Sequence, residues 1–212
     1  MINDNNKGSD NNNKTKRDFT LEQAVSLEIP SETNYTFFNA NCANLDEKFI
    51  LNNATCCCDF KKGRISNCTF KDSYLNSCIF EDMIFENCRF INVNFRKSEY
   101  VNCTFQNCAI LDDSNLTKVQ FENTIIKNCS LKGIILNSAD FVKCSIINTI
   151  FDNCSLCSTL ISETKIKNLT TSNLFFSEKT PLFVTKSKDG PWTELTDLVG
   201  FEEFIKAQDL EP

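Results

Sequence analysis

The chain has 212 residues, of which 41% are hydrophobic, with a net charge of −6 at pH 7, 13 cysteines and no histidine. This length suits one large domain or two small ones, and the acidity argues against nucleic acid as a partner. The lack of histidine excludes imidazole metal sites and catalysis by Cys–His or Ser–His pairs. No apolar run approaches the roughly 18 residues of a transmembrane helix, so we expect no membrane partner.

Residues 1–18 are polar, with six asparagines and no apolar residue after Ile2. Such a segment buries too little apolar surface to offset the entropy lost on ordering. We therefore predict a disordered leader, or alternatively a tail that recruits a partner. The segment has no apolar stretch of the kind found in export signals, so we expect a cytoplasmic protein.

Residues 19–57 are expected to form an N-terminal cap followed by an irregular first coil. Thr20 and Gln23 fit a capping box that would begin a short helix over residues 19–29, and Pro30 would end it. Beyond this helix a weak period of five marks the degenerate coil, at Tyr35, Ala40, Leu45, Ile50 and Thr55.

Residues 58–168 carry a strong internal repeat with a period of five. Each unit has a large apolar residue, here called its centre, and a small or medium residue two positions earlier. The centres are Phe60, Ile65, Phe70, Leu75, Phe80, Phe85, Phe90, Phe95, Tyr100, Phe105, Ile110, Leu116, Phe121, Ile126, Leu131, Leu136, Phe141, Ile146, Phe151, Leu156, Ile161 and Ile166.

A period of five fits neither a helix nor a continuous strand. Five residues advance an α-helix by about 500°, so successive centres would drift around it, and an odd period would alternate faces in a strand. The chain must therefore bend once per unit, with both inward residues on one short strand. Asparagine, which tolerates turn conformations, is predicted to make the corner two residues after a centre, at Asn67, Asn87, Asn92, Asn102, Asn107, Asn123, Asn128, Asn148, Asn153 and Asn168.

Several units resemble the pentapeptide repeat family, which has a small residue, a polar residue, Leu or Phe, and two variable positions. The match is carried by Asn67-Cys68-Thr69-Phe70, Asn87-Cys88-Arg89-Phe90, Asn102-Cys103-Thr104-Phe105, Asn128-Cys129-Ser130-Leu131 and Ala139-Asp140-Phe141. The resemblance implies an all-β fold, a right-handed quadrilateral parallel β-helix, in which four units of five would make one coil of twenty residues. We expect short helical caps at both ends of this solenoid, since terminal coils expose apolar faces and strand edges.

One extra residue interrupts the period between Ile110 and Ser114. A β-bulge or a longer corner would accommodate it. The alternative is a protrusion that contacts a partner, with Asp112 and Asp113 as its exposed charges.

The period fades after Ile166, and residues 169–212 are predicted to be an extension with a strand at 182–184 and an amphipathic helix over 193–207. This helix would cap the last coil. Alternatively it would form a homodimer contact, as the resemblance implies, with Trp192, Phe204 and Ile205 as the contact residues.

Nine of the 13 cysteines occupy the small inward position. Four of them fall in one column, about 4.8 Å apart from coil to coil. Such thiols are poorly oriented for disulfides and too spread out for tetrahedral zinc, so we interpret them as core residues. If any thiol is reactive, it should be Cys57 or Cys157, which point outward.

No residue pattern indicates catalysis, a cofactor or a metal site, so we predict a non-enzymatic protein. The preferred function is a structural scaffold that binds an unidentified partner protein. The alternative, which the resemblance suggests, is a DNA mimic that regulates a type II topoisomerase. Such a mimic needs an acidic column, whereas residues 58–168 hold 13 Lys and Arg against 12 Asp and Glu, a nearly neutral sum.

Overall fold

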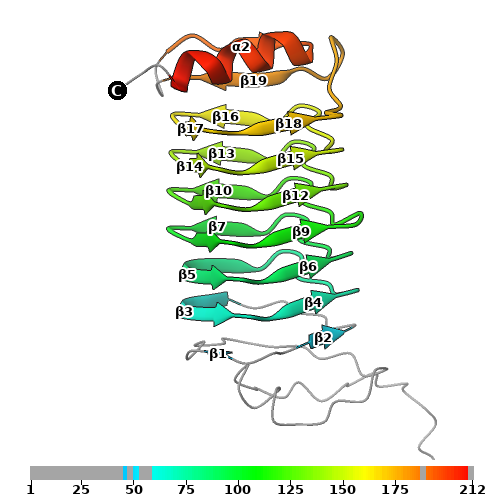
Figure 1. The fold of residues 1–212 in the computed structure, drawn as a ribbon, viewed down its shortest axis with the longest axis vertical. Helices are drawn as coiled ribbons and strands as arrows, with labels where there is room; N and C mark the ends of the chain where they lie inside the picture. The colour runs from blue at the N-terminus through cyan, green and yellow to red at the C-terminus, as the bar shows by residue number, and fades with distance from the viewer. Residues whose placement is uncertain (1–44, 47–49, 53–58, 187–189, 210–212) are drawn as a thin grey trace, which may run out of the picture.

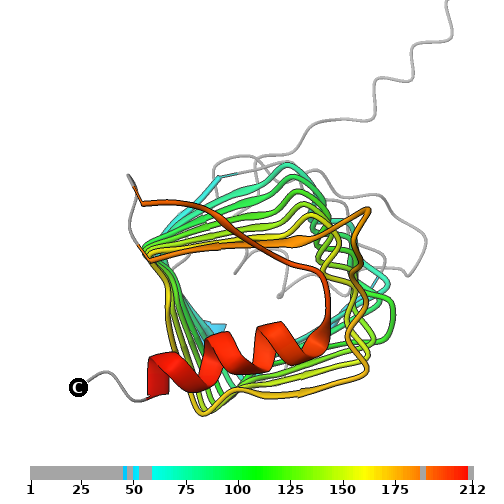
Figure 2. The ribbon, with the colours of Figure 1, turned by 90° about the horizontal axis from the view of Figure 1, so that it is seen from above.

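A computed structural model describes residues 45–46, 50–52, 59–186 and 190–209. These residues form a rod of stacked four-sided coils, closed at one end by the helix α2 (Leu198–Asp209) (Figures 1 and 2). The predicted all-β parallel solenoid with a C-terminal helix is confirmed. The predicted leader, the helix over 19–29 and Cys57 lie outside the described residues.

Three faces of the rod are strand ladders. The first face contains the first half of β3 (Asp59–Ser66) and of β5 (Ile79–Glu86), then β7 (Glu99–Val101), β10 (Gln120–Glu122), β13 (Asp140–Val142), β16 (Leu160–Ser162) and β19 (Leu182–Thr185). The second face contains β1 (Leu45–Asp46), the second halves of β3 and β5, then β8 (Thr104–Gln106), β11 (Ile125–Lys127), β14 (Ser145–Ile147) and β17 (Lys165–Lys167).

The third face contains β2 (Ile50–Asn52), β4 (Thr69–Lys71), β6 (Arg89–Ile91), β9 (Ala109–Leu111), β12 (Ser130–Lys132), β15 (Ile150–Asp152) and β18 (Thr170–Ser172). The fourth face is held by single parallel bridges, from Tyr74–Asn94 up to Ser155–Phe175.

The strand register follows the period of the sequence. Phe85 lies opposite Phe105, twenty residues on, and Tyr100 lies opposite Phe121, because the extra residue at the bulge adds one. The weak period of the early residues includes Ile50, but Leu51 is the residue that lies opposite Phe70. The register therefore slips by one residue in the earliest described coil, where the period is weakest.

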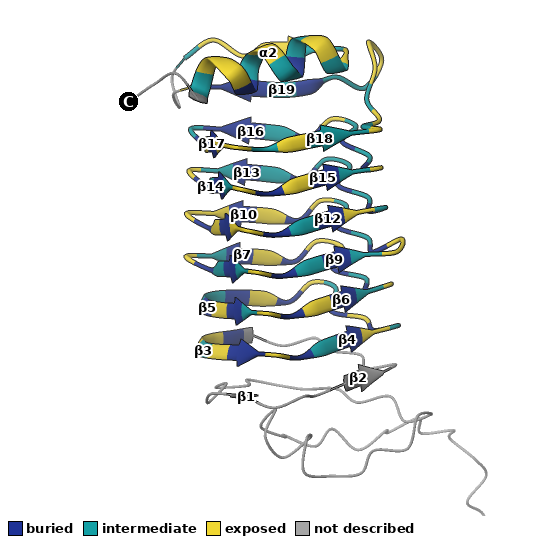
Figure 3. Ribbon diagram, viewed as in Figure 1, coloured by how far each residue is buried: buried dark blue, intermediate teal, exposed yellow. Residues whose placement is uncertain are grey.

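All 22 centres are buried, and the dark-blue inward positions of Figure 3 follow them up the rod. On the first face, rings of successive coils stack with centroids 4.6 to 5.1 Å apart, from Phe60 through Phe80, Tyr100 and Phe121 to Phe141. Within one coil the rings meet edge to face, as Phe85 and Phe90 do at 5.8 Å. The core is thus an aromatic stack in its lower half, with both favoured ring geometries.

The small inward residues also hydrogen-bond the backbone, which was not predicted. Thr124 Oγ1 lies 3.1 Å from the carbonyl oxygen of Tyr100 in the neighbouring coil, and it accepts from the N–H of Cys103. Cys103 Sγ lies 3.3 Å from the carbonyl oxygen of Phe80, the equivalent group one coil away. Cysteine at this position therefore replaces serine or threonine as a weak donor, in addition to filling space.

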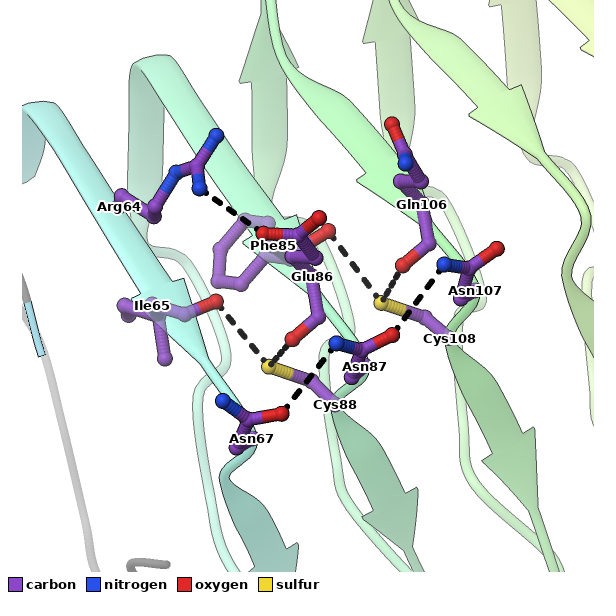
Figure 4. Close-up of polar contacts among 10 residues, drawn as sticks. All are labelled: Arg64, Ile65, Asn67, Phe85, Glu86, Asn87, Cys88, Gln106, Asn107 and Cys108. Carbon is purple, nitrogen blue, oxygen red and sulfur yellow. Dashed lines mark hydrogen bonds and ion pairs between the residues drawn. The ribbon is translucent and has the colours of Figure 1, made fainter. Parts of the chain in front are cut away.

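The corners are made as predicted. The residue two after each of the 22 centres has a left-handed backbone, with φ between 49° and 65°, and asparagine is its commonest type. Along the corner between the second and third faces, Nδ2 of each asparagine donates to Oδ1 of the asparagine before it at 2.9 to 3.2 Å. This ladder joins Asn67, Asn87, Asn107, Asn128, Asn148 and Asn168, and Figure 4 shows its first three members.

Stacking continues beyond residue 168, since β18 pairs with β15 and β19 pairs with β16. The predicted strand at 182–184 is confirmed as part of β19. The predicted helix begins too early: Thr193–Leu195 form β20, antiparallel to β19. Asp197 Oδ1 then accepts the N–H of Gly200 at 2.8 Å, which is the geometry of an N-cap.

Helix α2 covers the core at the end of the rod. Phe201 and Ile205 are buried, and Gln208 Oε1 accepts the backbone N–H of Ile166 at 2.9 Å. The helix thereby satisfies part of the open edge of the last coil. No helix in the described part of the chain has the length and apolar character needed to cross a membrane.

Candidate interaction surface

The first face carries an acidic zigzag. Within described residues 79–142, its outward strand positions hold four carboxylates and no lysine or arginine: Glu81, Glu99, Glu122 and Asp140. The corners that border this face carry Asp82 on one side and Lys97 and Lys118 on the other, and Lys61 in the preceding coil pairs with Glu81 at 3.3 Å. The strand carboxylates alternate sides from coil to coil. Glu99 lies opposite Gln120, which lies opposite Asp140, while Glu81 lies opposite Val101, which lies opposite Glu122.

This alternation keeps like charges off directly opposite positions, where they would repel. Successive strand carboxylates on one side of the strands are two coils apart, about 9.6 Å. Val101 fills the position between Glu81 and Glu122, and Gln120 fills the one between Glu99 and Asp140. Ile79, with 36% of its surface exposed, lies opposite Glu99. Burial raises the pKa of Asp140 above its ordinary value. The acidic zigzag is therefore a fixed array of charge interleaved with apolar contact surface.

The other faces differ in charge. Toward the C-terminal end of the rod, its upper half, the second face presents Lys127, Lys165 and Lys167. Toward the N-terminal end, its lower half, Arg64 forms an ion pair with Glu86 at 2.9 Å (Figure 4). The nearly neutral sum over residues 58–168 is thus an average over faces of opposite sign. Sequence reasoning missed this because it summed charges along the chain. The charge of each face would have followed from the outward residues of every fourth unit, considered together.

The extra residue forms a projecting corner between the third and fourth faces, visible after β9 in Figure 1. Asp112 and Asp113 both have left-handed φ, 51° and 60°, and both side chains are exposed as predicted. Ser114 Oγ donates to the carbonyl of Leu111 at 2.6 Å and accepts the N–H of Val93 at 3.0 Å. These bonds fix the corner from inside. Whether a partner binds it stays a prediction.

The three predicted dimer residues have different environments. Ile205 is 5% exposed and packs inside its own chain, Phe204 is half-buried, and Trp192 is 49% exposed. Phe204 lines a hollow of 470 Å³ with Leu195 and Pro191. The structure therefore leaves Trp192 and part of Phe204 available at the end of the rod.

Most of the described cysteines lie in the core, as predicted from the sequence. Eight are buried and take part in no disulfide within the described residues, and Cys157 is half-exposed, with its Sγ 3.7 Å from the carbonyl of Phe175. Burial raises the pKa of Cys103 to about 12 and that of Cys144 and Cys154 to about 11. These thiols are therefore neutral at physiological pH. Among the described residues, no three or more Cys, Asp or Glu side chains gather as metal ligands would.

Comparison with known proteins agrees with the geometry. Residues 114–153 match the family model for pentapeptide repeats in eight copies. This stretch of the chain consists of pentapeptide repeats. No curated protein sequence matches the chain.

Solved structures of pentapeptide repeat and related proteins resemble it at low identity. QnrB1, a plasmid-mediated fluoroquinolone resistance protein, is 12% identical over 82% of this chain and 99% of its own, with a TM-score of 0.27. HetL, involved in heterocyst differentiation regulation in the cyanobacterium Nostoc sp. strain PCC 7120, is 10% identical over 67% and 84%, with a TM-score of 0.27. Rfr23 from the cyanobacterium Cyanothece 51142 is 16% identical over 66% and 86%, with a TM-score of 0.24.

Proposed function

We propose that this protein is a non-enzymatic cytoplasmic scaffold whose first face binds a basic partner protein. The observation that carries the proposal is the acidic zigzag over residues 79–142. Charge of one sign on a fixed surface steers a partner of opposite charge and fixes its orientation. The aliphatic side chains between the carboxylates supply the apolar contact that an interface core needs.

Rigidity supports the same proposal. The strands of the first face hydrogen-bond to the coils above and below, and the rings of Phe80, Tyr100 and Phe121 stack beneath them. A surface that is ordered before binding loses little conformational entropy when the partner arrives. The first face is therefore suited to recognise a matching surface without rearrangement.

A DNA mimic is the second candidate, and the acidic zigzag is the observation in its favour. Its charge density argues against it. The four strand carboxylates of the first face span three coil steps, about 14 Å. Duplex DNA of that length carries about 8 phosphates. The first face thus has about half of the charge density of DNA, which favours a basic protein surface of lower density as its partner.

The test compares two charge reversals of equal size. The Glu99→Lys/Glu122→Lys variant reverses the first face, and Lys165→Glu/Lys167→Glu reverses the upper second face. Proteins captured by the wild-type chain from extracts of its own cells are quantified by mass spectrometry. A basic protein lost with the first variant and retained with the second supports the proposal. If both variants capture the same proteins as the wild type, the first face is not the binding surface.

A supercoiling assay with DNA gyrase separates the second candidate. Inhibition or protection of gyrase by micromolar protein, abolished in Glu99→Lys/Glu122→Lys, would favour the DNA mimic. No effect of the wild-type chain is expected from the scaffold.

We also propose a homodimer through the C-terminal segment, because Trp192 and the hollow beside Phe204 lie at the end of the rod. Sedimentation equilibrium tests it. The wild-type chain should weigh twice its 24.2 kDa, and Trp192→Ala should shift the balance to monomer. A monomeric wild type over the accessible concentration range would contradict the dimer.

A further inference from the structure

A hollow lies beside the projecting corner at Asp112 and Asp113. The hollow measures 420 Å³ and opens on the fourth face, and its walls include Asp72, Tyr74, Asn92 and Asp113. It spans three coils, because Asp72, Asn92 and Asp112 occupy equivalent corners in succession. Backbone bonds from Asp112 and Asp113 to the carbonyls of Lys132 and Gly133, at 3.2 and 2.8 Å, hold the corner in place from the next coil.

The walls of the hollow combine two carboxylates with an exposed aromatic ring. Asn92 Nδ2 donates to Asp72 Oδ1 at 2.8 Å, which orients that carboxylate. Asp113 is exposed, and so is Tyr74, with 53% of its surface accessible. Carboxylates beside an aromatic face favour an organic cation, through charge-assisted hydrogen bonds and a cation–π contact.

Spacing distinguishes among cations. Asp72 and Asp113 lie two coil steps apart along the rod, about 10 Å at the backbone. A guanidinium that bridges two carboxylates separates their oxygens by about 8 Å, from two N–H···O distances of about 2.8 Å and the width of the ion. An ammonium would separate them by only about 6 Å, and a calcium ion by about 5 Å. The guanidinium is the widest of the three ions, so it bridges carboxylates on corners two coils apart with the least displacement of their side chains.

The hollow also contains two side-chain amides, those of Asn94 and Asn115, which can contact a peptide backbone. Asn94 Oδ1 accepts the N–H of Arg96, and Asn115 Oδ1 accepts the N–H of Thr117. Their carbonyl oxygens are thus engaged, and both side chains line the hollow. Their Nδ2 groups are then the donors that these two side chains offer to the backbone carbonyls of a peptide segment. We propose that this hollow binds an arginine side chain presented by a peptide segment of a partner.

This arginine site lies on the opposite side of the rod from the corner that joins the first and second faces. Its test therefore does not depend on what the first face binds, and either proposal can fail alone.

The test is a titration of the ¹⁵N-labelled full chain, followed by backbone amide shifts, with the peptide acetyl-Gly-Arg-Gly-amide. Saturable shifts should cluster at Tyr74, Asn94, Asp113 and Asn115. The lysine peptide should bind about threefold more weakly or worse, and the uncharged citrulline peptide about tenfold more weakly. Equal binding of the citrulline peptide, or shifts that do not cluster at the hollow, would overturn the proposal.

Variants sharpen the result. Asp113→Asn should weaken the arginine peptide about fivefold, while Glu99→Gln, an exposed carboxylate on the first face, should leave its affinity unchanged. Deletion of Asp113 restores the five-residue period and should abolish binding while the unfolding transition persists. Unchanged affinity in Asp113→Asn refutes the site even if the deletion fails to fold. Calcium chloride that reproduces the same shifts would show a metal site instead.

Discussion

Asparagine at the corners should stabilise the rod through its backbone conformation as well as its side chain. Asn107 tests this, since it has φ 54°, donates to Asn87 and accepts from Asn128, each at 3.2 Å. Asn107→Gly removes both amide bonds, worth about 1 kcal/mol together at an exposed site, but keeps a residue that adopts a left-handed φ freely. Asn107→Ala loses the same bonds and adds about 1 kcal/mol of left-handed strain. The expected losses are about 1 kcal/mol for glycine and about 2 kcal/mol for alanine.

The sign of the difference is the informative result, because at ordinary positions glycine is less stable than alanine by about 0.5 to 1 kcal/mol. Urea unfolding followed by circular dichroism gives the midpoints, and Ser145, at a strand position of β14, supplies the matched control. Glycine should be the more stable variant at Asn107 and the less stable one at Ser145. Equal or greater stability of Asn107→Ala would refute the account of the corners.

Three further predictions concern the core. Phe121→Ala interrupts the column of stacked rings and should lower the free energy of unfolding by about 3 to 5 kcal/mol, measured by urea unfolding. Burial raises the pKa of Cys103 to about 12 and that of Cys144 and Cys154 to about 11. Above pH 9 these three thiols therefore ionise in the unfolded chain before they ionise in the folded one. Stability present below pH 9 should then fall up to pH 11–12, by up to about 1.4 kcal/mol per thiol and pH unit, and the triple threonine variant should show a smaller fall in melting temperature. In native thiol labelling, Cys157 should react first among the described cysteines, and fast reaction of several core thiols would contradict their burial.

Much of the fold could be predicted because the period of five constrains both the inward residues and the corner. Phe85 and Phe105 face inward in stacked positions as the spacing required, and Asn87 makes its corner for the conformational reason expected. The one-residue shift in strand register at Leu51 could not be predicted, because the early units are too irregular to define the five-residue period. The start of α2 was missed because β20 pairs with β19, a tertiary contact that overrides local helical pattern.

The candidate surfaces were harder to predict. Asp112 and Asp113 stood out as an interruption of the period, and the structure places them at an exposed corner. The hollow below them depends on Tyr74, about 40 residues earlier, which only the stacking of coils brings close. The acidic zigzag likewise joins Glu81 and Glu122 across coils. Such surfaces follow from the sequence only once the twenty-residue coil is assumed and outward positions are assigned to faces.

The central claim is that the first face contacts a basic partner, and photo-crosslinking tests it most directly. A photoreactive residue replaces Gln120, which lies between Glu99 and Asp140, or, as a control, the exposed Ile125 on the second face. After irradiation in the cells of origin, position 120 should give a discrete adduct with a basic protein. That adduct should be absent at position 125 and lost when Glu99→Lys/Glu122→Lys is added. An adduct at position 120 that persists in the reversed variant, or no adduct there at all, would contradict the claim.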